Sequence, residues 1–103
     1  MTLAADVTAL YADLFRSGLA ELFVIDDEEV YGVLDVHDEL HMDTMGLGQQ
    51  VRVTTITIPA DAFTTAAVED SLTRDATDDT YQIREIRPVG DGLEKQLVVA
   101  LVP

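Results

Sequence analysis

Apolar side chains recur at helical spacing at the start of the chain. Steps of four, three, one and three residues separate the apolar positions Leu3, Val7, Leu10, Tyr11 and Leu14. These steps place all five side chains on one stripe of an α-helix. Gly18 stands where a glycine ends a helix. The pattern predicts a helix over about residues 2–16.

After Gly18 the pattern changes to short runs rich in β-branched and aromatic residues, which are typical of strands. The predicted strands cover about residues 20–25, 30–37, 51–58, 68–73, 80–89 and 93–101. The acidic segment 26–29 and the segment Gly90-Asp91-Gly92 mark hairpin turns. One helix followed by six strands predicts a single, mainly β domain over residues 1–103, a small antiparallel β-barrel or sandwich with one N-terminal α-helix.

Two of these runs carry more detailed predictions. The apolar positions of 51–58 change phase between Val53 and Ile56, which predicts a β-bulge there. In 80–89 we expect Tyr81, Ile83 and Ile86 to face the core.

Residues 38–50 show no regular period and predict a long exposed loop. The segment mixes acids with methionines, glycines and glutamines. Methionines on such a loop suit an adaptable protein contact. The candidate partner-binding residues are Leu40, Met42, Met45, Gly46, Leu47, Gly48, Gln49 and Gln50. The alternative is that these side chains fold back onto the domain.

The charge balance argues against nucleic acid as a binding partner. Twenty acidic residues against six Lys and Arg give a net charge of −14, so nucleic acid phosphates would repel the chain. The acidity fits either simple solubility, including a salt-rich host, or a surface that lets DNA pass without sticking. The sequence has no apolar run of membrane-spanning length and no signal-peptide pattern. Without cysteine it has no disulfides or thiolate sites, and the expected location is the cytoplasm or an assembly made there.

The segment His37-Asp38-Glu39-Leu40-His41 resembles the H-E-x-x-H signature of zinc peptidases, but its glutamate is one position too late. With His37 near the end of a strand and His41 in the loop, the two imidazoles would lie about 13 Å apart, because a strand rises about 3.3 Å per residue. We therefore expect no metal site and no cofactor. No nucleophile has a catalytic sequence context, and we expect no catalytic residues and no enzyme activity.

The order of the elements resembles a known protein family. Gly32-Val33-Leu34-Asp35 is similar to a "G-[IV]-[FL]-[DE]" segment on the second strand of that family. The last hairpin is similar to the family pattern "Y-x-[VI]-x-x-[VI]-x-P-[DG]-G-x-G" at Tyr81, Ile83, Ile86, Pro88, Gly90 and Gly92. The family comprises the small head–tail joining proteins, also called head-completion or stopper proteins, of long-tailed phages and prophages, among them the joining protein of phage lambda. The resemblance spans nearly the whole chain.

The resemblance implies a structural virion protein. Such proteins form a homo-oligomeric ring between the portal or adaptor proteins of the head and the tail, close the DNA exit, and provide the tail-docking surface. The implied partners are further copies of the chain, portal and adaptor proteins, and tail-terminator or tail-tube proteins. Packaged DNA would pass through the lumen without specific binding. The implied location is the virion neck, after assembly in the host cytoplasm, and residues 38–50 match the family's assembly loop.

Three other functions stay open at this point. The chain could be a stand-alone acidic protein-binding domain with no virion role. It could form a tail-terminator ring, although that role usually involves a longer chain with a larger α/β sheet. It could also be a metal-binding module that uses His37 and His41.

Overall fold

The computed structural model describes residues 3–42, 45–63 and 67–103, with side chains from residue 9 onward. Its elements are α1 (Leu3–Arg16), β1 (Glu21–Ile25), β2 (Glu28–Met42), β3 (Gly48–Pro59), β4 (Ser71–Arg74), β5 (Asp79–Val89), the 3-10 turn η1 (Gly90–Gly92) and β6 (Glu94–Val102). Within the described ranges no helix has the length and apolar character needed to cross a lipid bilayer.

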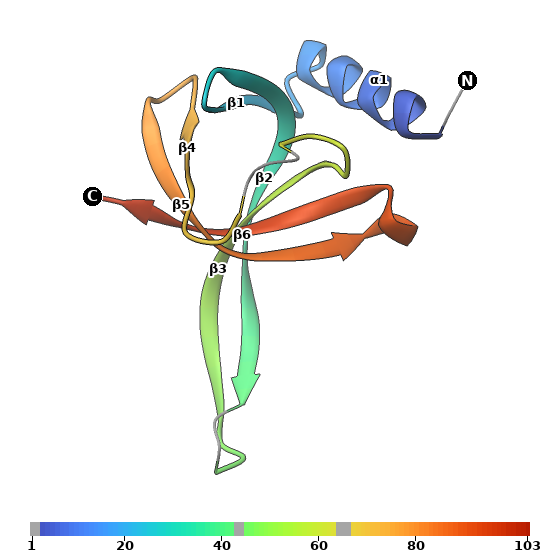
Figure 1. The fold of residues 1–103 in the computed structure, drawn as a ribbon. Coiled ribbons are helices and arrows are strands. Elements are labelled where there is room, and N and C mark those ends of the chain that lie inside the picture. The colour runs from blue at the N-terminus through green and yellow to red at the C-terminus, as the bar shows by residue number, and fades with distance from the viewer. Residues whose placement is uncertain (1–2, 43–44, 64–66) are drawn as a thin grey trace.

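The six strands form one antiparallel sheet that closes on itself in the order β1-β2-β3-β6-β5-β4 (Figure 1). Every pairing is antiparallel, and the closing contact joins β1 to β4 through Phe23 with Arg74 and Val24 with Thr73. The prediction of a mainly β fold with about six antiparallel strands and one N-terminal helix is confirmed.

Most element boundaries lie close to the predicted ones. The helix ends at Arg16 as predicted, and its predicted first residue lies outside the described residues. The bounds of β1, β5 and β6 agree with the predictions within one residue. The strand predicted at 68–73 begins only at Ser71, because Glu69 has a φ of 80° and so leaves the extended conformation.

The first hairpin turn is tighter than the acidic segment 26–29 indicated. Only Asp26 and Asp27 form the turn, and their φ values of 47° and 69° are those of a two-residue hairpin connection. Ile25 pairs directly with Glu28, so Glu28 and Glu29 belong to β2. Aspartate tolerates positive φ better than most residues, because its short side chain can hydrogen-bond locally.

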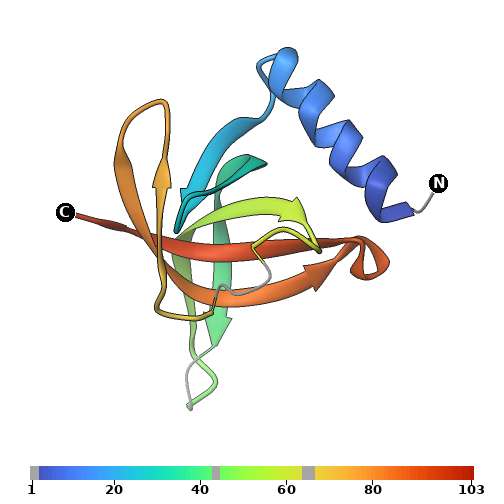
Figure 2. The same cartoon turned by 45° about the horizontal axis from the view of Figure 1, so that its top comes forward.

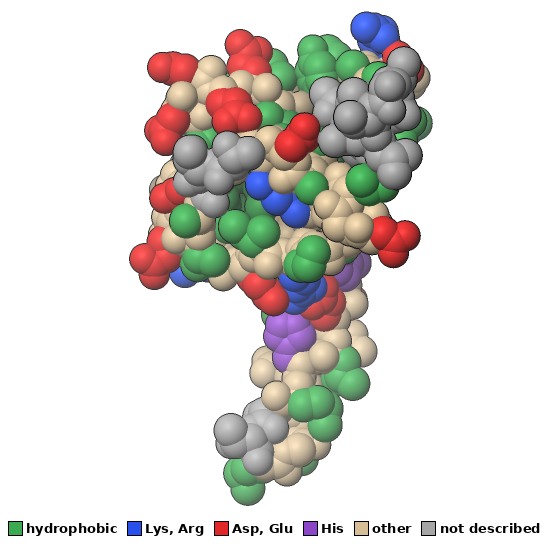
Figure 3. All heavy atoms as spheres, turned by 45° about the vertical axis from the view of Figure 1, so that its right-hand side comes forward, with side chains coloured by type: hydrophobic (Ala, Val, Ile, Leu, Met, Phe, Trp, Pro, Cys, Tyr) green, Lys and Arg blue, Asp and Glu red, His purple; other side chains and the backbone are tan. Residues whose placement is uncertain are grey.

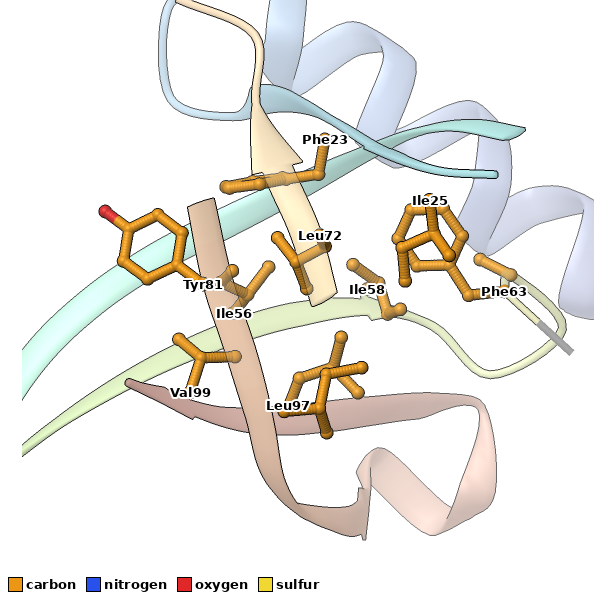
Figure 4. Close-up of a cluster of buried hydrophobic side chains, with 11 residues drawn as sticks. Phe23, Ile25, Ile56, Ile58, Phe63, Leu72, Tyr81, Leu97 and Val99 are labelled. Atoms are coloured by element: carbon orange, nitrogen blue, oxygen red, sulfur yellow. The ribbon is translucent and has the colours of Figure 1, made fainter. Parts of the chain in front are cut away.

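One hydrophobic core fills the closed sheet (Figure 4). Seven of its members, drawn from β1, β3, β4, β5, β6 and the turn after β3, are at most 1% exposed: Phe23, Ile56, Ile58, Phe63, Leu72, Ile83 and Leu97. The predicted core residues of β5 are confirmed: Tyr81 and Ile83 are buried, and Ile86 packs against the cluster.

The predicted bulge lies on a different strand. The pairing of β3 with β2 and β6 runs without interruption through Val53 and Ile56, so the bulge prediction there is wrong. The register shift is on β5 instead, where Ile83 pairs with Val99 and Glu85 with Val98, which leaves Arg84 as the extra residue. This extra residue returns Ile86 to the core side although it lies three positions after Ile83.

Strand β3 changes apolar phase because both of its faces become buried. Ile56 and Ile58 face the core, while Val53 and Thr55 lie on the opposite face and are also buried. Thr55 is fully buried, and among the described residues its hydroxyl oxygen has no hydrogen-bond partner. Thr55 pairs with Val98 and Val98 with Glu85, so these three residues share this second face of the sheet.

The prediction of a loop over residues 38–50 is wrong for residues 38–42 and 48–50. Residues 38–42 continue β2 and residues 48–50 begin β3, with Met42 paired to Gly48, while residues 43–44 lie outside the described residues. Beyond the last β3–β6 pair, Thr54 with Val99, this hairpin extends away from the rest of the sheet as an arm (residues 37–53; Figures 1 and 2). With no core to face, an exposed hairpin is under no burial constraint, so acids, glycines and glutamines can stand among its apolar residues.

Candidate interaction site

The arm presents two faces, because side chains alternate along a strand. The even-numbered residues of β2 share one face with their partners on β3, so Leu40 and Met42 stand beside Gln50 and Gly48. Leu40 is 62% exposed and Met42 61%. A Cβ atom at Gly48 would come within 2.8 Å of Leu40 Cδ1, so the absence of a side chain there lets Leu40 lie across the paired strand. This side is the apolar face of the arm.

The end of the arm is also apolar and exposed. Met45 is 83% exposed and Leu47 64%. Gly46 has a φ of 79°, a conformation that side-chain-bearing residues rarely adopt. Figure 3 shows hydrophobic side chains along the arm and at its end, away from the main body. The structure thus brings together the predicted partner-binding residues Leu40, Met42, Met45, Gly46, Leu47, Gly48, Gln49 and Gln50, and all of them are exposed.

The opposite face of the arm carries a charged cluster at its root, where the arm joins the body (Figure 3). His37 lies between two carboxylates, with Nδ1 at 2.8 Å from Asp35 Oδ2 and Nε2 at 2.7 Å from Glu39 Oε2. His41 approaches the same Glu39 carboxylate from the other side, with Nε2 at 3.2 Å from Oε1. Arg87 on β5 donates to both oxygens of Glu39, which links the arm to the body.

The electrostatics of this cluster follow from its hydrogen bonds. Both ring nitrogens of His37 face carboxylate oxygens, and only the doubly protonated imidazolium donates to both. The bonds to Glu39 and then to Asp35 raise the pKa of His37 above its ordinary 6.5. Hydrogen bonds from Arg87, His37 and His41 lower the pKa of Glu39 to about 2. The cluster therefore connects the arm to the body through ion pairs.

The two histidines of the segment that resembles H-E-x-x-H lie on this face. His41 belongs to β2, where it pairs with Gln49, and not to a loop. Both imidazoles reach the Glu39 carboxylate from opposite sides. In the described part of the chain no group of three or more His, Asp or Glu side chains is arranged to hold a metal ion. What the arrangement provides is a set of ion pairs.

A groove between α1 and the sheet was not foreseen from the sequence. It has a volume of about 300 Å³ and lies against Tyr11 of the helix, the start of β2 and the end of β3. Among the described side chains, Phe15 stacks on Tyr31 with ring centroids 4.4 Å apart, and the Tyr11 hydroxyl donates to Glu94 at 2.5 Å. Leu10, predicted on the apolar stripe, is 52% exposed, so this part of the stripe does not pack against the sheet.

The groove is lined by both apolar and acidic residues. The apolar ones are Val30, Tyr31, Pro59 and Ala62, and the acidic ones are Glu28, Glu29 and Asp61. Sequence reasoning missed it because its walls come from three separate segments of the chain. Comparison of the chain with known protein families and with curated proteins finds no match.

Proposed function

We propose that this protein is a head–tail joining protein of a tailed phage or prophage, which forms a ring between the portal or adaptor of the head and the tail. The observation that carries the proposal is the arm, a hairpin that extends from a small closed sheet and exposes Leu40, Met42, Met45 and Leu47. The order of elements resembles that of the joining family. Residues 38–50, which match the family's assembly loop, belong to this arm.

The arm gains little stability from the rest of the described chain. Its two strands pair only with each other within the described residues, because β1 pairs with β2 no further than Gly32 and β6 with β3 no earlier than Thr54. A two-stranded hairpin alone is marginally stable in water. Contiguous exposed apolar side chains typically mark an interaction surface. Both properties favour an arm that becomes buried on assembly.

The charge of the chain fits the same role. A ring through which DNA leaves the head should not bind phosphates. Acidic side chains repel the DNA backbone, and with 20 acids against six Lys and Arg the surface is dominated by negative charge. The joining function requires binding to proteins and passage of DNA, and it requires no catalysis.

Electron microscopy of particles from a virus that lacks this gene tests the proposal. We expect filled or leaking heads beside free, finished tails, and complete virions when the gene is supplied in trans. Supplying the variant Leu40→Ser/Met42→Ser should fail to restore virions. The matched control, Leu101→Ser/Val102→Ser, changes two exposed apolar residues of β6 outside the arm and should restore them.

Normal virions in the absence of the gene would overturn the joining role. The chain would then be a stand-alone acidic protein-binding domain. Full rescue by the arm variant would remove the arm from the assembly mechanism.

A further inference from the structure

We infer that two copies of the chain pair through the outer edge of β3, residues 48–52, as neighbouring antiparallel strands. The two arms then form one four-stranded sheet in the order β2-β3-β3-β2, around a two-fold axis at Gln50. A two-fold contact closes after two copies. The inference therefore concerns the free protein and goes beyond the proposed ring.

Several strands have a second edge that is unpaired among the described residues. Four such edges are five residues or longer: 28–32 and 33–42 of β2, 48–53 of β3, and 84–89 of β5. An open edge presents a row of unpaired N–H and C=O groups to which another strand can bind. Proteins usually protect such edges with charged residues, prolines or bulges.

Three of these four edges carry such protection. The first edge of β2 has two carboxylates and the second has three. The edge of β5 has the bulge at Arg84 and also Pro88, which has no N–H to donate. Residues 48–53 contain no acid and no proline, and their pairing with β2 runs without a bulge. This edge of β3 is therefore the one best suited to accept another strand.

The distribution of charge favours a second copy of the same segment at this edge. Outside the arm the chain carries 17 of its 20 acidic residues and five of its six Lys and Arg, a net charge of −12. Contact between two bodies would bring these like charges together. Two segments 48–52 carry no charged residue other than Arg52, and Asp38 lies 3.7 Å from it in the same copy.

The register follows from symmetry and from the space along β3. In an antiparallel pair around a two-fold axis, one residue lies opposite itself. From Thr54 onward β6 occupies the outer edge of β3. An axis at Val51 would place Gly48 of one copy opposite Thr54 of the other, whereas an axis at Gln50 places it opposite Arg52. The pairing therefore centres on Gln50.

This register keeps the two acidic bodies apart. Antiparallel strands run in opposite directions, so the bodies lie at opposite ends of the paired arms, which extend away from the rest of the sheet (Figure 1). The two Thr54 residues are eight positions apart along the strands, or about 26 Å at ~3.3 Å per residue. The Debye length at physiological ionic strength is about 8 Å, so salt screens most of the repulsion between the bodies.

The side chains along the edge suit the same register. Gln50 meets its own counterpart, and each amide can donate to and accept from the other. Arg52 of the second copy lies opposite Gly48, and Leu40 leans across this glycine. The aliphatic stem of that arginine can therefore cover part of the exposed Leu40 side chain. The pairing also converts two hairpins into a four-stranded sheet, which is more stable than two strands alone.

Substitutions at the axis residue test the inference by sedimentation equilibrium of the full chain. Gln50→Lys and Gln50→Glu each place like charges opposite each other, and each should weaken dimerisation about two- to fivefold. The lysine variant should do so although its net charge falls to −13. An equimolar mixture of the two variants should associate at least about fivefold more tightly than either variant alone.

The matched control places the same charges in the body. Ala76 is exposed in the turn between β4 and β5. A mixture of Ala76→Lys and Ala76→Glu has the same net charges, and it should associate no more tightly than its separate components. Circular dichroism of each variant verifies that its fold is retained.

Hydrogen exchange identifies the edge directly. In the wild type, protection of the amides of residues 48–52 that do not bond to β2 should increase with protein concentration. Protection of the amides of residues 33–42 should not change.

Three results would overturn the pairing of two copies. These are a wild type that stays monomeric at every protein concentration, and a mixture of the Gln50 variants that gains no affinity. The third is protection of residues 48–52 only after a portal or tail protein is added, which would assign the edge to a foreign strand. All three leave the joining role in place, because the genetic test in the virus does not depend on how the free protein associates.

Discussion

Arg87 on β5 donates two hydrogen bonds to the Glu39 carboxylate on β2, at 3.1 Å to Oε2 and 3.3 Å to Oε1. The two residues are 48 positions apart in the chain. Arg87 also pairs with Glu85 at 3.0 Å, while His37 and His41 complete the environment of Glu39. This pair is a side-chain connection between the body and an arm whose own strands pair only with each other over the described residues, and it holds the root of the arm.

Replacing Arg87 with methionine should loosen the arm without unfolding the body. The change keeps most of the aliphatic stem and removes both bonds to Glu39. We expect faster hydrogen exchange at the amides of residues 37–42 and 48–53, and unchanged exchange in β6 and at Ile83. Arg84→Met, at the exposed bulge position, is the matched control and should leave the arm as in the wild type. Unchanged exchange in the arm of the Arg87 variant would contradict a restraining role.

The charged cluster should make the arm sensitive to pH. The pKa of His37 is raised above 6.5, so its contribution is present at lower pH and is lost as the pH rises through that raised value. The pKa of Glu39 is lowered to about 2, so its contribution is present above its ordinary 4.5 and is lost as the pH falls toward 2. The arm should be held most firmly between about pH 4.5 and 6.5.

Hydrogen-exchange protection of the arm, corrected for intrinsic rates, tests this prediction. Protection in the wild type should decrease as the pH rises above 6.5. His37→Gln keeps a hydrogen-bond donor but cannot titrate, so its arm should show no such decrease. Parallel pH profiles for the two proteins would show that another group is responsible.

Replacing Thr55 with valine should stabilise the fold. Thr55 is fully buried, and its hydroxyl lacks a partner among the described residues. A buried unsatisfied polar group costs about 1–3 kcal/mol, so Thr55→Val should raise the free energy of unfolding by about 1 kcal/mol in urea titrations. Thr55→Ser keeps the hydroxyl and loses a methyl group, and it should be less stable by about 1 kcal/mol. A destabilised valine variant would indicate that the hydroxyl makes a hydrogen bond in solution.

Two glycines should respond differently to the same substitution. A Cβ atom at Gly32 would lie 2.8 Å from Ile58 Cγ2 and 3.1 Å from the backbone oxygen of Thr57, and neither atom can move without disturbing the core. Gly32→Ala should therefore cost about 1–3 kcal/mol. At Gly48 the nearest atom, also at 2.8 Å, belongs to the exposed side chain of Leu40, which can rotate away. Thermal unfolding of both alanine variants should show a loss of stability only for Gly32.

Local periodicity predicted most of the fold because each element that covers the core has one face in contact with it. Residues 80–89 show this clearly: burial of Tyr81, Ile83 and Ile86 was predicted from their apolar character. The bulge at Arg84, which lets both Ile83 and Ile86 face the core, was not predicted. The phase change in 51–58 was misassigned, since an apolar residue on the second face of β3 looks the same in sequence as one displaced by a bulge.

In the arm, the local pattern of apolar and polar residues did not predict the secondary structure. Residues 38–42 and 48–50 are strands whose faces are both solvated, so no burial constraint imposes alternation on them, although their exposed apolar side chains were correctly chosen as the candidate contact. By itself the sequence determined the helix, the presence of six strands, the acidic surface and these candidate residues, because they depend on neighbouring positions. Only the tertiary structure decided that Arg87 meets Glu39, that both histidines face one carboxylate, and that α1 leaves a groove, because these contacts join segments that the closure of the sheet brings together.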